Sequence, residues 1–68
     1  MNQDSAELTQ LFHRLNNQLG IILSHAELIE AKAQDDSQKA RATQVVTATL
    51  EALATSRQIR LTIEPVYL

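Results

Sequence analysis

The stretch LTQLFHRLNNQLGIILSHAELIEAKA, residues 8–33, decides the fold. Its apolar residues recur in alternating steps of four and three, at Leu8, Phe12, Leu15, Leu19, Ile22, Ala26, Ile29 and Ala33. This is the heptad spacing of a helix that packs along a seam. Leu11, Leu23 and Leu28 widen the seam into a face broader than one neighbouring helix covers. We therefore predict a helix over about residues 5–33 that contacts more than one other helix.

A short polar segment, Gln34–Ser37, follows this helix and contains no large apolar residue. Gln38 stands three residues after Asp35, which is the spacing of a capping box at the start of a helix. A second helix is expected over about residues 37–61, followed by a short C-terminal tail, 62–68. Because the link between the two long helices is short, they should lie antiparallel as a hairpin.

The second helix has a polar stripe and a weaker apolar face. The stripe consists of Ala40, Gln44, Thr47, Glu51, Thr55 and Gln58. The opposite face centres on Ala42, Val46, Thr49 and Leu53, with Val45, Leu50 and Ala52 at its edges. Because most of these side chains are small, they bury little apolar area. The second helix should therefore depend on the first for its stability.

The size of the chain indicates that the hairpin associates with a second copy. With 68 residues and no cysteine, the chain forms one small domain that cannot be stabilised by disulfides. A core of this size is marginal alone, and natural scaffolds this small gain stability from disulfides, metals or partner chains. Residues 1–68 are therefore expected to form one all-α domain, a long antiparallel hairpin that pairs into a homodimeric four-helix bundle.

Several classes of function are disfavoured by composition. The formal net charge of -2 argues against a nucleic-acid partner, which calls for a basic stripe. No apolar run approaches the length of a membrane span, so no membrane role is expected. No His/Cys cluster has metal-ligand spacing, and neither a metal nor a cofactor is expected in this chain. The N-terminus lacks the features of a signal peptide, which makes the cytoplasm the expected compartment.

The residue with the most chemical potential is His13, which falls just beside the seam and should point to solvent. Its neighbours on the helix surface are small or polar: Thr9, Gln10, Asn16, Asn17, Gly20 and Ser24. An exposed histidine is largely neutral at pH 7, and its neutral ring nitrogen can accept a phosphoryl group. The alternative is an ordinary surface histidine. His25, beside the seam, is expected to be a partly buried packing residue.

The segment LFHRLNNQLGIILSHAELIE, residues 11–30, resembles the phosphoacceptor box of the dimerisation and phosphoacceptor domain of two-component sensor histidine kinases. The resemblance is most specific at His13, Leu15, Asn16, Asn17 and Leu19, and it is continued by Ile22-Leu23 and Ala26-Glu27-Leu28. It extends more weakly to about Arg60. In that family a helical hairpin dimerises into a four-helix bundle, which agrees with the fold predicted from the heptads.

The resemblance implies roles for individual residues. His13 matches the phosphorylated histidine, and Asn17 matches the position that orients water to dephosphorylate a partner receiver. Asn16 matches the neighbouring polar position. Arg14 stands where the family usually has an acid that accepts a proton, which disfavours self-phosphorylation but not receipt of phosphate from elsewhere. Gln18 replaces a frequent proline.

The implied partners are a second copy of the chain and the receiver domain of a response regulator. An ATP-binding kinase domain, in cis or in trans, is a further expected partner. The chain alone cannot be a kinase, since with a single glycine it has no Gly-rich phosphate loop. Two other functions stay open. One is a non-catalytic dimerisation or protein-interaction module with a degenerate phosphoacceptor box, and the other is a phosphatase-type regulator that uses Asn17.

Overall fold

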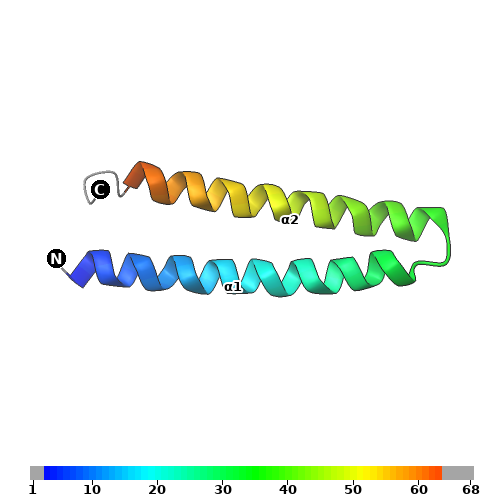
Figure 1. Ribbon diagram of the computed structural model, residues 1–68, viewed down its shortest axis with the longest axis horizontal. Coiled ribbons are helices and arrows are strands. Elements are labelled where there is room, and N and C mark those ends of the chain that lie inside the picture. The colour runs from blue at the N-terminus through cyan, green and yellow to red at the C-terminus, as the bar shows by residue number, and fades with distance from the viewer. Residues whose placement is uncertain (1–2, 64–68) are drawn as a thin grey trace.

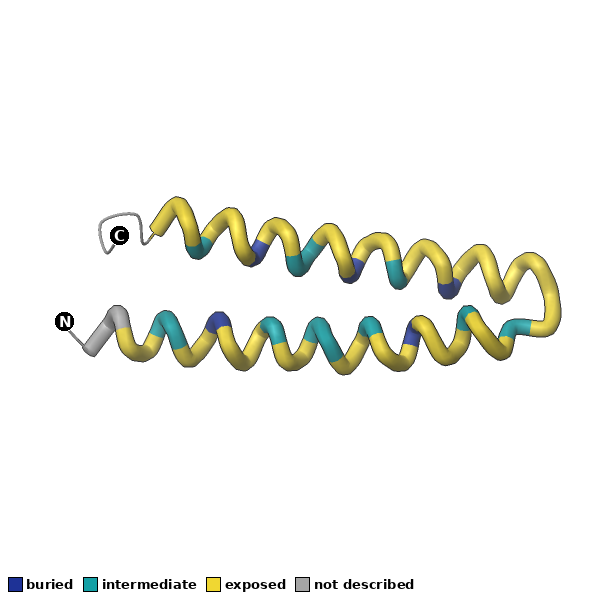
Figure 2. The backbone as a smooth tube through the Cα atoms, viewed as in Figure 1, coloured by how far each residue is buried: buried dark blue, intermediate teal, exposed yellow. Residues whose placement is uncertain are grey.

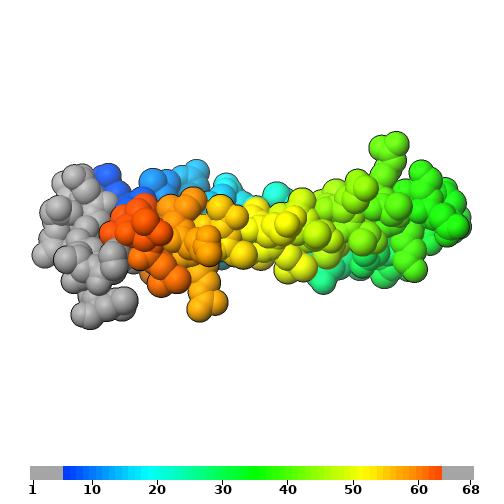
Figure 3. Space-filling view, turned by 90° about the horizontal axis from the view of Figure 1, so that it is seen from above, coloured from blue at the N-terminus to red at the C-terminus, as the bar shows by residue number. Residues whose placement is uncertain are grey.

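The protein is two long helices packed against each other as an antiparallel hairpin (Figure 1). The computed structural model describes residues 3–63, with side chains from residue 6 onward. Helix α1 spans Gln3–Lys32 and α2 spans Asp36–Ile63. The rod measures 51 × 16 × 13 Å, and Figure 3 looks onto the outer surface of α2, which covers much of α1. The expected all-helical hairpin is confirmed, while most of the expected tail lies outside the described residues.

The turn between the helices is set by Asp35, which caps α2. The backbone N–H of Gln38 donates to Asp35 Oδ1 at 2.7 Å, and the N–H of Lys39 donates to the Asp35 carbonyl oxygen at 3.1 Å. The side chain thereby satisfies an N–H that has no partner within the helix. The capping position predicted from the spacing of Asp35 and Gln38 is confirmed, and it explains why a three-residue link suffices.

The two helices meet along matched heptad rows (Figure 2). From Phe12 to the end of α1 and the first residue after it, the buried and half-buried residues are Phe12, Asn16, Leu19, Gly20, Leu23, Ala26, Glu30 and Ala33. Those of α2 are Ala42, Val46, Thr49, Ala52, Leu53, Ser56 and Arg60. Apart from Gly20 and Ala52, both rows advance in steps of four and three, as expected for helices packed at a shallow angle. The predicted centre of the apolar face of α2, Ala42 to Leu53, is confirmed.

The predicted seam of α1 is only half correct. Phe12 and Ala26 are buried against α2, whereas Leu15, Ile22 and Ile29 remain 40%, 46% and 59% exposed. One neighbouring helix covers only one stripe of α1, and α2 covers the row that includes two polar residues. Asn16 and Glu30 can face α2 because each receives a hydrogen bond from an α2 hydroxyl. The row of Leu15, Ile22 and Ile29 is left uncovered.

The core that results is thin. Among the described residues, the only buried apolar side chains are Phe12, Ala26 and Ala42, and the buried polar ones are Thr49 and Ser56. Large apolar side chains that remain exposed are Leu11, Leu15, Ile21, Ile22, Leu28, Ile29, Val45, Leu50, Ile59, Leu61 and Ile63. Because burial of apolar area is the main driving force of folding, most of that force is unused in the single hairpin.

Candidate functional site

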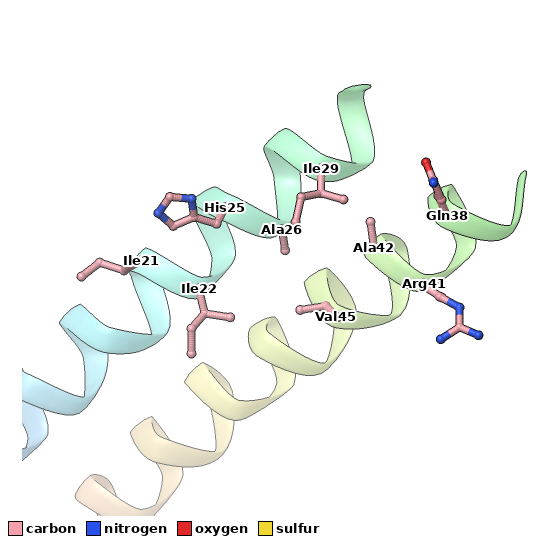
Figure 4. Close-up of a pocket in the computed structure, with 9 residues that line it drawn as sticks. All are labelled: Ile21, Ile22, His25, Ala26, Ile29, Gln38, Arg41, Ala42 and Val45. Atoms are coloured by element: carbon pink, nitrogen blue, oxygen red, sulfur yellow. The ribbon is translucent and has the colours of Figure 1, made fainter. Parts of the chain in front are cut away.

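One face of the hairpin is an apolar groove between the helices (Figure 4). Ile22 and Val45 point toward one another across it, and Ala26 and Ala42 form its floor where the helices approach. The groove has a volume of about 510 Å³ and continues along α2 past Ala48 and Ala52. We define the apolar face as Leu15, Ile22 and Ile29 of α1 with Val45, Ala52 and Ile59 of α2.

His13 lies on the opposite side of the hairpin. Nine residues separate it from Ile22, which is about 2.5 turns, so the two side chains project from opposite sides of α1. The same spacing separates Leu50 from Ile59 on α2. His13 and Asn17 are both exposed, as predicted, and four residues place them on one helix surface. We define the polar face as His13, Asn17, Gly20 and Ser24 of α1 with Leu50 and Arg57 of α2.

Asn16 does not share the exposed setting of His13. The sequence placed it on the solvent-facing stripe, but it is half-buried against α2, where Ser56 Oγ donates to Asn16 Oδ1 at 3.3 Å. Thr9 is half-buried as well. Asn16 therefore links the two helices directly beneath the polar face. Sequence analysis did not single out Ser56, although it continues the seven-residue spacing of Ala42 and Thr49.

The polar face is hollowed one to three turns beyond His13. Asn17, Gly20 and Ser24 line a shallow depression on α1, and a Cβ built at Gly20 would meet nothing within 4 Å. His25 lies at the edge of this depression and is exposed, so the prediction that it is partly buried is wrong. The absence of a side chain at Gly20 leaves room for a partner surface to approach the helix backbone.

Arg14 is exposed and points away from the depression. It lines a separate hollow with Glu7, Gln10 and Leu11. An acid at this position would stand next to His13 in the chain, but the guanidinium that replaces it cannot accept a proton. Among the described side chains of α1, no carboxylate lies on the polar face within two turns of His13. Glu7 lines the separate hollow with Arg14, and Glu27 lies fourteen residues further on than His13.

Two features that would indicate a function are missing from residues 3–63. No group of three or more His, Cys, Asp or Glu residues is arranged to hold a metal ion. Neither described helix has a stretch long and apolar enough to cross a membrane. Comparison of the chain with protein-family models, curated proteins and solved structures found no match. The geometry of the two faces is therefore the basis for assigning a function.

Proposed function

We propose that the chain is a dimerisation and histidine-phosphoacceptor module of a two-component signalling system. Two hairpins pair through their apolar faces into a four-helix bundle, and His13 exchanges a phosphoryl group with the receiver domain of a response regulator. The observation that supports this best is the placement of His13 and Asn17, both exposed, on the side of α1 away from the apolar groove. Pairing through the groove leaves both side chains accessible.

The partner that fits the groove is a second copy of the chain. The hairpin buries three apolar side chains among its described residues, too few for an independent core. Each copy offers the same face, with rows at seven-residue spacing on both helices, and such a face is self-complementary about a twofold axis. Packing Ile22, Ile29 and Val45 of two copies together would create the core that one hairpin lacks.

The chemistry of transfer at His13 needs only an accessible ring nitrogen. The nitrogen's lone pair forms an N–P bond while the P–O bond to the receiver's aspartate breaks, and that aspartate leaves as a carboxylate. The other ring nitrogen keeps its proton, so no base is required. Arg14 does not obstruct this step, whereas attack on ATP would lose the help of an acidic neighbour. Asn17, one turn away on the same face, is placed to orient water toward the receiver's acyl phosphate.

The experiment that tests the proposal is transfer from a receiver. Receivers of the source organism, loaded with labelled phosphate, are incubated with the chain, and acid-labile label on the chain is measured. His13→Ala should abolish the label, whereas His25→Ala, which removes the chain's other histidine, an exposed side chain that lines both the depression and the apolar groove, should retain it. Sedimentation must show that both variants keep the parent's mass. Label that persists in His13→Ala would refute the assignment of His13.

A second candidate is a non-catalytic interaction module, favoured by Arg14 in the position of the usual acid and by the extent of the apolar groove. The two functions differ in one outcome. An intact dimer that accepts no label from any receiver supports the interaction module. A dimer that accelerates the loss of phosphate from a receiver without becoming labelled, and loses that effect in Asn17→Ala, supports a phosphatase-type regulator.

A further inference from the structure

We propose that Arg57 of α2 forms, together with His13 of α1, a phosphoryl-binding site that spans the two helices. This inference rests on the proposed function of His13 and adds a positioning residue to it. Its role is to hold the phosphoryl oxygens after transfer and to draw the incoming anion toward the ring nitrogen. The phosphoacceptor box itself, residues 11–30, lies wholly on α1, so the resemblance assigns no role to Arg57.

The register of the hairpin places Arg57 beside His13. The hydrogen bond from Ser56 to Asn16, at 3.3 Å, fixes which turns of the two helices lie side by side. Arg57 directly follows Ser56, and Asn16 is one turn beyond His13, a rise of about 4.5 Å. Both Arg57 and His13 project from the polar face, about a quarter turn from the row that packs between the helices. On this polar face, the long side chain of Arg57 can therefore reach from α2 toward the imidazole on α1.

The charges around this pair favour an anion. Arg57 is exposed, and no hydrogen bond or ion pair within the described residues engages its guanidinium. The one acidic residue in this part of α2, Glu51, belongs to the outer polar stripe. The chain has a net charge of -2, so Arg57 offers an incoming anion a positive charge on an otherwise acidic chain.

The chemistry of the guanidinium suits a phosphoryl group. Its planar fork donates two parallel N–H bonds to two oxygens of a phosphate, and it stays charged at every relevant pH. A phosphoryl group on an imidazole presents three such oxygens away from the ring. The usual alternative for a basic residue near the end of a helix is to complement the dipole of α2, which requires no phosphoryl group at all. The test must separate these two roles.

The test uses phosphoramidate, a small donor that phosphorylates histidine without a partner protein. The ring nitrogen forms the N–P bond as the P–N bond of phosphoramidate breaks, and ammonia leaves with the proton already on it. All variants carry His25→Asn, so that His13 is the one reactive histidine. Arg57→Gln is compared with Lys39→Gln, which removes another exposed positive charge of α2, eighteen residues away near the turn. Circular dichroism checks that both variants keep their helix content.

Two measurements decide the outcome. Arg57→Gln should slow labelling of His13 about two- to threefold, the effect of losing one nearby, solvent-screened charge. In ³¹P NMR titrations it should raise the pKa of the phosphoryl group by about 0.3, because a neighbouring cation favours the dianion. Arg57→Lys should restore most of the pKa effect, and Lys39→Gln should change neither value. A helix-dipole role would alter thermal stability and leave the phosphoryl pKa unchanged.

The inference and the proposed function can fail separately. If His13 is labelled at the same rate with the same phosphoryl pKa in the parent, Arg57→Gln and Lys39→Gln, the site across the helices is refuted while the phosphoacceptor role survives. If phosphoramidate fails to label His13 while free imidazole in the same solution is labelled, the histidine is inaccessible and both are refuted. If the Arg57 effect appears but no receiver transfers phosphate, the anion site holds and the proposed partner is wrong.

Discussion

The two faces of the hairpin expose apolar residues to a similar degree but arrange them differently. Ile22 on the apolar face is 46% exposed, and Leu50 on the polar face is 51% exposed. Ile22 stands in a row with Leu15 and Ile29, opposite Val45 across a continuous groove. Leu50 shares the polar face with Gly20 and Ser24 of α1 and with Arg57, two turns away on α2. Exposure alone therefore does not mark an interface, whereas contiguous apolar rows on both helices do.

The largest effect should come from placing a charge on the apolar face. Ile22→Asp should dissociate and largely unfold the protein, because an unpaired carboxylate in the core of a four-helix bundle costs several kcal/mol. Leu50→Asp is the matched variant on the polar face, with similar exposure and the same new charge. It should keep the dimer and lose little helix content. Analytical ultracentrifugation and far-UV circular dichroism at micromolar concentration measure both.

The comparison would break in two ways. A parent chain that sediments as a folded monomer at micromolar concentration would remove the dimer altogether. Dissociation by Leu50→Asp with tolerance of Ile22→Asp would reverse the assignment of the faces, and His13 would then lie at the interface between copies. Because dimer stability depends on chain concentration, all variants must be compared at one concentration.

The second effect concerns Gly20, the residue that hollows the polar face. Gly20→Ala should raise the free energy of unfolding by about 1 kcal/mol, because glycine inside a helix is unfavourable by that amount relative to alanine. An added Cβ meets nothing within 4 Å, so no clash offsets the gain. Urea denaturation measures the change. The reciprocal variant Ala54→Gly, at an exposed position in the interior of α2, should lower stability by a similar amount.

A loss of stability or a lower mass in Gly20→Ala would mean that another chain packs against this backbone. The polar face would then be an interface between copies, and the groove would need another occupant. An unchanged dimer with higher stability keeps the two faces distinct. That result would also show that packing within the dimer does not require a glycine at position 20. Access for a partner protein would then be the remaining reason for a glycine there.

The sequence predicted the helices well because their signals are local. The heptad spacing from Leu8 to Ala33 and the capping pair of Asp35 and Gln38 need no knowledge of the partner helix. The same spacing could not say which of two overlapping rows faces α2. On apolar character alone, the row of Leu15, Ile22 and Ile29 would be expected to face α2 in preference to the row with Asn16 and Glu30. The structure uses the row with Asn16 and Glu30 instead, because hydroxyls on α2 satisfy these polar groups.

The candidate site was predictable in part for the same reason. Exposure of His13 and Asn17 follows from their place relative to the heptad, whichever row faces α2. The position of Asn16 does not, since it depends on Ser56, forty residues away in the chain. Arg57 likewise comes beside His13 only through the register of the hairpin. Residues on one helix could be assigned from spacing, whereas contributions from the second helix required the packed structure.

The smallest effect should come from the hydrogen bonds between side chains that hold the two helices in register. A double-mutant cycle with Asn16→Ala and Ser56→Ala removes the contribution of helix propensity, which otherwise masks the loss of a hydroxyl. The coupling energy should be roughly 0.5 kcal/mol, at the low end for a hydrogen bond because its atoms lie 3.3 Å apart in a partly buried setting. Urea denaturation of the four proteins at one concentration measures it.

The matched cycle uses Glu30→Ala and Thr43→Ala. Thr43 Oγ1 donates to Glu30 Oε2 at 2.6 Å, a shorter bond to a charged group, but an exposed one. Water competes for both partners there, so the coupling energy should be no larger than for Asn16 and Ser56 despite the better geometry. A larger value would show that the turn end of the hairpin sets the register. Arg57 would then be placed beside His13 by the turn, and breaking the Ser56 bond should leave the phosphoryl pKa unchanged.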